Sequence, residues 1–140
     1  MSNAIVKQFE NIVKKALSHY SEKNEVAVEE VGISISLDNE EELVYTLLKA
    51  EKDGQRIKGY NKIEELEFVK GILLRKFDLT GLSVIVPAFI KQIVTSLCAA
   101  HECSKQDIVV NLFAVNGKIA MYLYINKKFV EVLDLKTLLE

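Results

Sequence analysis

The stretch DIVVNLFAVNGKIAMYLYINKKFVEVL, residues 107–133, decides the fold of this chain. At its centre, Asn116-Gly117 separates two alternating apolar runs, which is the strongest short-range signal of a β-hairpin. With these two residues as the loop, one face of the hairpin pairs Ala114, Leu112, Val110 and Ile108 with Ile119, Met121, Leu123 and Ile125. All eight are apolar, so a one-residue slip would turn the whole set toward water. The pattern therefore predicts both the hairpin and its register.

A third strand is expected directly after this hairpin. Asn126-Lys127-Lys128 would turn the chain into Phe129–Leu133, with either 126–127 or 127–128 as the loop. In both cases simple alternation places Val130 and Val132 on the core face, beside Leu123 and Ile125.

The remaining chain predicts helices and strands that pack into a single α+β domain over residues 1–140. The first expected elements are a helix over Ile5–Tyr20 and a strand over Val26–Leu37 with a bulge near Glu29-Glu30. A strand over Leu43–Ala50 and, after a turn at Asp53-Gly54, a short strand over Gln55–Tyr60 follow. Further along, we expect a helix from a capping box at Asn61–Glu64 to about Lys76, a core helix from Pro87 to about Glu102, and a helical turn over Leu135–Leu139. Together they indicate an antiparallel sheet with helices packed on it.

The predicted order helix–strand–strand–(strand)–helix occurs twice, from Ile5 and from Pro87. A duplicated unit with pseudo-two-fold symmetry would explain this, and so would chance, because amphipathic helices before hairpins resemble one another. The suggested pairing lays Phe9, Ile12-Val13, Leu17 and His19 beside Phe89, Ile93-Val94, Leu97 and His101. In element order and length the chain resembles two sets of small acidic αβ binding proteins, secretion chaperones and roadblock-type adaptors, although no motif accompanies the resemblance.

Composition excludes several functional classes. The net charge of −2 argues against non-specific nucleic-acid binding, which usually needs a positive field. The longest uncharged run, Leu79–Ile90, is interrupted by Gly81 and Pro87 and is too short to cross a membrane. Two cysteines are too few for a disulfide framework, which favours reduced thiols and a cytoplasmic location. Neither GxGxxG, GxxxxGK[ST] nor GxSxG occurs, so the sequence predicts no cofactor.

The densest chemical cluster is Cys98, His101 and Cys103, with His19 as a conceivable further ligand. Cys98 and His101 lie one helical turn apart and could bind Zn²⁺ or form a thiol–imidazole pair. The simpler interpretation is favoured: Cys98 lies on the apolar stripe, and a histidine suits a helix C-terminus. On one continuous helix the two cysteines would point in different directions.

Two charged segments offer weaker candidate sites. The acidic run Glu40–Glu42 could bind a divalent cation, but it lacks the spacing of a calcium loop. A basic segment beside Tyr60 is a candidate surface for nucleic acid or a phosphorylated ligand, although a solvated hairpin tip is the favoured interpretation; the segment contains Lys49, Lys52, Arg56, Lys58 and Lys62.

The second face of the hairpin is the most informative feature for function. It pairs Val109, Asn111, Phe113 and Val115 with Tyr124, Tyr122, Ala120 and Lys118, and the third strand adds Phe129, Glu131 and Leu133. A solvent-facing side would alternate to polar residues, so either another element of the chain or a partner covers this face. The favoured function is a non-catalytic cytoplasmic binding or assembly protein, a homodimer that uses Val109, Phe113, Tyr122, Tyr124 and Phe129. An enzyme or metal protein at the cysteine cluster, and a nucleic-acid or phospho-ligand binder at Lys49–Lys62, are the alternatives.

Overall fold

The computed structural model describes residues 3–51, 61–70 and 85–134, and it confirms the α+β class. The elements are α1 (Asn3–Asn24), the 3-10 helix η1 (Val28–Glu30), β1 (Val31–Leu37), β2 (Leu43–Glu51), β3 (Asn61–Lys70), α2 (Ile85–His101), the 3-10 helix η4 (Lys105–Asp107), β4 (Ile108–Val115), β5 (Lys118–Ile125) and β6 (Lys128–Asp134). The expected strand at Gln55–Tyr60 and the expected helical turn at Leu135–Leu139 lie outside the described residues.

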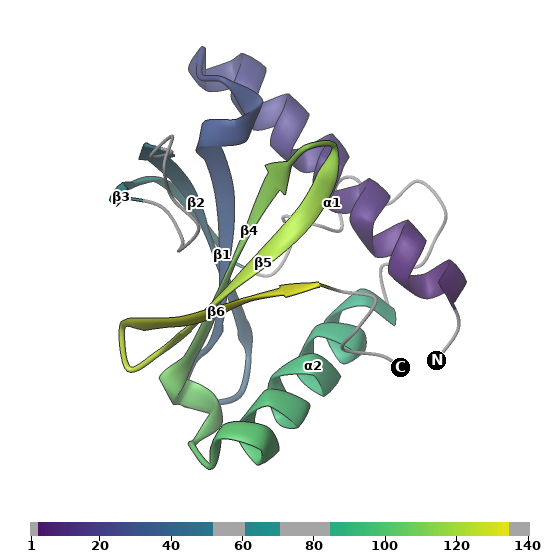
Figure 1. The fold of residues 1–140 in the computed structure, drawn as a ribbon, viewed down its shortest axis with the longest axis vertical. Coiled ribbons are helices and arrows are strands. Elements are labelled where there is room, and N and C mark those ends of the chain that lie inside the picture. Colours follow the sequence, from purple (N-terminus) through teal and green to yellow (C-terminus); the bar gives the residue numbers. More distant parts are fainter. Residues whose placement is uncertain (1–2, 52–60, 71–84, 135–140) are drawn as a thin grey trace.

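All six strands form one twisted antiparallel sheet in the order β3-β2-β1-β4-β5-β6. Both helices pack on the same side of this sheet, and we call the opposite side the outer face (Figure 1). Alternate residues of the central strands meet the helices in one core, which includes Ile33 and Ile35 of β1, Val110 and Leu112 of β4, and Met121 and Leu123 of β5.

The β4–β5 hairpin has the register that the sequence predicts. Ile108 pairs with Ile125, and Leu112 pairs with Met121. The loop residues Asn116 and Gly117 have φ angles of 52° and 78°, as a type I′ turn requires. The apolar pattern and the turn chemistry are therefore sufficient to specify this part of the fold.

In β6 the predicted alternation is wrong, because a β-bulge interrupts it. The loop is 126–127, and Tyr124 pairs with Phe129, but the next pair is Leu123 with Glu131. Val130 is thus the extra residue, and the strand reverses its faces beyond it. Val130 and Val132 are 38% and 43% exposed instead of buried, while Leu133 packs against the core.

The helix predicted from Asn61 is also wrong, since 61–70 is strand β3. β3 pairs along β2 with Val44 opposite Lys70 and Leu48 opposite Glu65, and its register shifts twice. This pairing satisfies the backbone groups on the free edge of β2, which outweighs the local helical signals of the capping box and the glutamates.

The other predicted elements are confirmed with changed ends. α1 is longer than Ile5–Tyr20, β2 matches Leu43–Ala50 closely, and Pro87 lies in the first turn of α2. The expected bulge near Glu29-Glu30 is instead η1, so that β1 begins only at Val31.

The two halves of the chain share the way in which each helix leads into its strand. Glu25 and Glu102 follow the helices with φ angles of 54° and 52°, and a 3-10 helix then precedes β1 and β4. When α1 is aligned on α2 through these two glutamates, buried residues of one helix coincide with buried residues of the other. This alignment is shifted by one helical turn from the pairing suggested by the sequence. It pairs Ile12, Val13, Ala16, Leu17 and Tyr20 with Phe89, Ile90, Ile93, Val94 and Leu97. The duplication itself stays a prediction.

Candidate protein-interaction surface

Four aromatic rings lie in contact on the outer face of β4, β5 and β6. The Tyr122 ring packs edge-on against Phe113, with centroids 5.7 Å apart. The Phe129 ring lies 6.3 Å from Tyr122 and 5.7 Å from Tyr124. Cross-strand pairing on one face places these side chains next to one another, as the register predicts. We call these four residues the aromatic cluster.

Phe113 is the buried end of this cluster. Its side chain is 0% exposed, and its ring occupies the space above Gly32 on the neighbouring strand β1. Tyr122 is only 8% exposed. Both residues therefore support the surface from below, and neither supplies much contact area to a partner.

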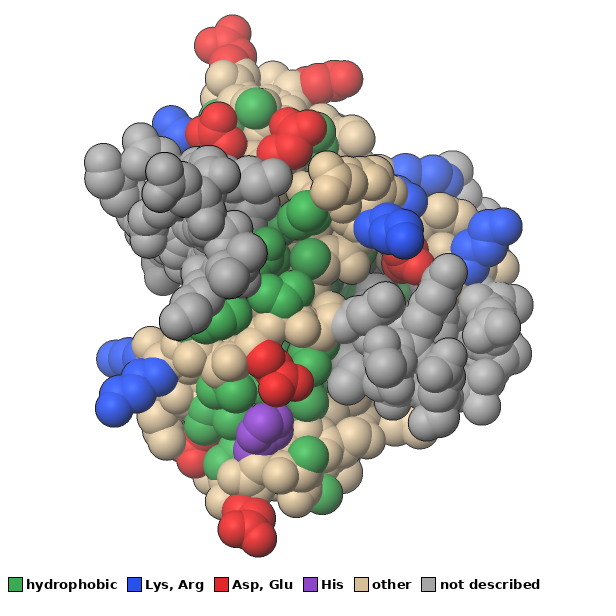
Figure 2. Space-filling view, in the orientation of Figure 1, with side chains coloured by type: hydrophobic (Ala, Val, Ile, Leu, Met, Phe, Trp, Pro, Cys, Tyr) green, Lys and Arg blue, Asp and Glu red, His purple; other side chains and the backbone are tan. Residues whose placement is uncertain are grey.

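The accessible part of the surface lies toward β6. Tyr124 and Phe129 are partly buried against the cluster, Val109 is half-buried, and Val130 and Val132 are the exposed large hydrophobic residues of the described chain. Figure 2 shows one view of the molecule in which hydrophobic side chains reach the surface near the middle, with an acidic side chain and a histidine among them. The bulge thus creates apolar surface that alternation did not predict.

The same bulge removes two residues from the predicted outer face. Glu131 lies opposite Leu123, and Leu133 opposite Met121, so both belong to the side that carries the core. Lys118 remains exposed at the hairpin end, opposite Val115. The prediction that Lys118 and Glu131 share one face is therefore wrong.

Asn111 is a buried polar residue in the middle of the outer face. It pairs with Ser34 on one side and with Tyr122 on the other, and its side chain is 4% exposed. Within the described part of the chain, its Oδ1 has no hydrogen-bond partner. Leaving such an acceptor unsatisfied costs about 1–3 kcal/mol. The sequence placed Asn111 on this face, but gave no sign that it would be buried.

The candidate cluster Cys98, His101 and Cys103 lies where α2 ends. α2 terminates at His101, Glu102 adopts a left-handed conformation, and the Cys103 N–H donates to the Cys98 carbonyl at 3.3 Å. The chain therefore turns back after His101, and the two cysteines do not lie on one continuous helix.

The chemistry at this turn does not resemble an activated thiol. Burial, followed by interaction with Cys103, raises the pKa of Cys98, whereas a nucleophilic cysteine needs a lowered one. His19 lies on α1 with its ring 5.0 Å from that of Tyr20. No group of three His, Cys, Asp or Glu side chains in the described ranges could hold a metal ion.

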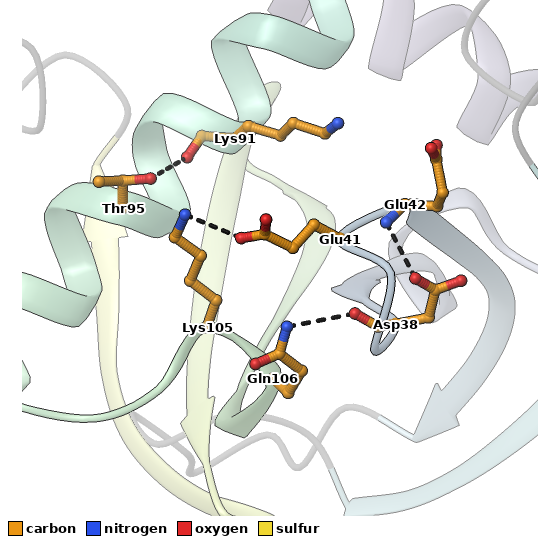
Figure 3. A network of polar contacts seen from close by, with 7 residues as sticks. All are labelled: Asp38, Glu41, Glu42, Lys91, Thr95, Lys105 and Gln106. Carbon is orange, nitrogen blue, oxygen red and sulfur yellow. Dashed lines mark hydrogen bonds and ion pairs between the residues drawn. The ribbon is translucent and has the colours of Figure 1, made fainter.

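The acidic turn Glu40–Glu42 is held by hydrogen bonds and an ion pair (Figure 3). The Asp38 carboxylate accepts the backbone N–H groups of Glu40 and Glu42, each at 2.9 Å. Lys105 of η4 forms an ion pair with Glu41 at 3.0 Å, and Gln106 donates to the Asp38 carbonyl. The turn therefore links β1 and β2 to the segment after α2.

The basic segment lies mostly outside the described residues. Lys52, Arg56 and Lys58 fall there, while Lys49 is half-buried on β2. A nucleic-acid or phospho-ligand surface at Lys49–Lys62 stays a prediction.

No protein-family model, curated protein or solved structure matches this chain. Among the residues that the structure describes, no helix is both long enough and apolar enough to cross a membrane.

Proposed function

We propose that this chain is a non-catalytic cytoplasmic binding or assembly protein, and that it forms a homodimer through the outer face beside β6. The contact is supplied by Tyr124, Phe129, Val109 and Val132. Phe113 and Tyr122, the buried members of the aromatic cluster, lie beneath it. No cofactor takes part.

The observation that carries this proposal is the exposure of Val130 and Val132 next to the partly exposed rings of Tyr124 and Phe129. Both helices pack on the other side of the sheet. Contiguous apolar surface of this kind commonly marks a contact site, and tyrosine suits such a site because its ring is buried while its hydroxyl stays hydrated.

A second copy of the chain is the proposed partner because the apolar surface lies at β6, an edge strand of the sheet. A two-fold axis beside β6 would bring the same apolar patch of two copies face to face, so that each covers the other.

The experiment compares the molar mass of matched variants by light scattering. Val132→Glu and Tyr124→Glu place a charge in the proposed contact, and we expect each to weaken dimerisation on the order of 100-fold or more. Gln92→Glu adds the same charge on an exposed position of α2 and should leave the dimer intact. An unchanged far-UV spectrum shows that each variant is folded, and a dimer that survives Val132→Glu and Tyr124→Glu contradicts the proposed surface.

A further inference from the structure

The turn after α2 brings two free cysteines together. Glu102, with φ 52°, reverses the chain, and the backbone hydrogen bond from Cys103 to Cys98 then closes the last helical turn. Both side chains are partly exposed and both pack against the margin of the core. They are therefore reachable from solvent and lie on the same side of the turn.

The geometry of this turn suits a disulfide. A disulfide needs Cα atoms within about 7 Å and Cβ atoms that point toward each other. The backbone N–H···O bond between the two residues brings their Cα atoms to about this separation. Both side chains pack against the same core, which places the two thiols on one side of the turn.

The corresponding turn after α1 shows that the fold does not need sulfur at these positions. There, Glu25 has φ 54°, and the Val26 N–H donates to the Ser21 carbonyl at 3.0 Å. Ser21 and Val26 occupy the places of Cys98 and Cys103, and the Ser21 hydroxyl donates to the Val26 carbonyl. A hydroxyl and an aliphatic side chain are thus sufficient to build this turn.

The segment that follows the cysteines is tied to distant parts of the sheet. Lys105 pairs with Glu41, and Gln106 donates to the Asp38 carbonyl (Figure 3). The Asn126 N–H donates to the Asp107 carbonyl. A covalent link before this segment would fix the connection from α2 to these turns.

We propose that Cys98 and Cys103 form a reversible disulfide by exchange with a low-molecular-weight disulfide such as oxidised glutathione. The thiolate of one cysteine attacks a sulfur of the small disulfide and releases one small thiol. The second cysteine, as thiolate, attacks the mixed disulfide and releases the other small thiol. The protein loses two protons and two electrons, and the small disulfide takes up both. This inference is independent of the proposed dimer.

The test incubates the full-length reduced protein in glutathione buffers of graded oxidation, followed by acid quenching and mass spectrometry. We expect one product, with a mass lower by two hydrogen atoms and no bound glutathione. Cys98→Ser and Cys103→Ser each lack the second thiol and should stop at the glutathione adduct. If the wild-type chain instead retains glutathione or forms disulfides between chains, the proposal is wrong.

A second measurement shows whether the folded turn favours the disulfide, or whether the short distance between the two cysteines along the chain is sufficient. The equilibrium constant for disulfide formation is measured in the folded protein and in the same chain unfolded by urea. Because the folded turn already holds the residues together, we expect a constant about tenfold or more larger in the folded state. Equal constants, or a larger one in the unfolded chain, would overturn the proposal.

Discussion

The ring of Phe113 on β4 fills the space above Gly32 on β1, so that a Cβ built at Gly32 would lie 2.4 Å from Phe113 Cζ. We therefore expect Gly32→Ala to destabilise the protein by about 1–3 kcal/mol, because the buried ring cannot move aside freely. Urea unfolding of the variant and the wild type measures the difference.

A double-mutant cycle shows whether the ring is the cause. In a Phe113→Leu background the added methyl group meets a smaller side chain, so Gly32→Ala should cost clearly less than in the wild type. Equal costs in the two backgrounds would mean that another contact excludes the methyl group.

The β4–β5 turn gives a second prediction. Gly117 has φ 78°, a conformation that a β-branched residue resists, and Gly117→Val should cost about 1–2 kcal/mol or more. Nothing lies within 4 Å of the position of its missing Cβ, so the cost arises from the backbone and not from a clash. Gly117→Asn is the matched control and should be milder, since asparagine tolerates this region. Equal losses from both substitutions would argue against the proposed backbone origin.

Leu97 tests the role of α2 in the core. It is buried among core residues, and Leu97→Ala should cost about 2–5 kcal/mol through lost burial and a cavity. The exposed neighbour Ser96 provides the control, because Ser96→Ala should change the free energy of unfolding by less than about 0.5 kcal/mol. A loss from Leu97→Ala below about 1 kcal/mol would show that the helix contributes little to stability.

Because Tyr45 is buried, we expect the free energy of unfolding to fall at alkaline pH. Burial raises the pKa of Tyr45 from 10.0 to about 12. Because the folded-state pKa is the higher one, its contribution is fully present below pH 10 and is lost as the pH rises from 10 toward 12. The loss should reach about 3 kcal/mol. Tyr45→Phe should remove this part of the pH dependence, and an unchanged alkaline profile in that variant would assign the effect to other groups.

The sequence predicted the β4–β5 hairpin completely because two local signals agree there. Asn116-Gly117 specifies the turn, and eight apolar positions specify the register. The aromatic composition of the outer face followed directly from that register. When turn chemistry and periodicity agree in this way, the structure of a segment can be predicted without knowledge of its tertiary contacts.

β3 and β6 could not be predicted in the same way, because long-range pairing decides them. Asn61–Lys70 carries helix-favouring glutamates, but its pairing with β2 makes it a strand. The alternation of apolar and polar residues in the sequence of β6 does not indicate the bulge at Val130. This bulge nevertheless exposes Val132 and removes Glu131 from the outer face. The burial of Phe113 likewise depends on Gly32, a residue far away in sequence.

The molar mass of the wild-type protein as a function of concentration tests the proposed homodimer most directly. Sedimentation equilibrium or light scattering should show a mass that rises with concentration toward twice the 15.8 kDa of one chain. A mass that stays at 15.8 kDa up to the highest soluble concentration would contradict the proposal that this protein acts as a homodimer.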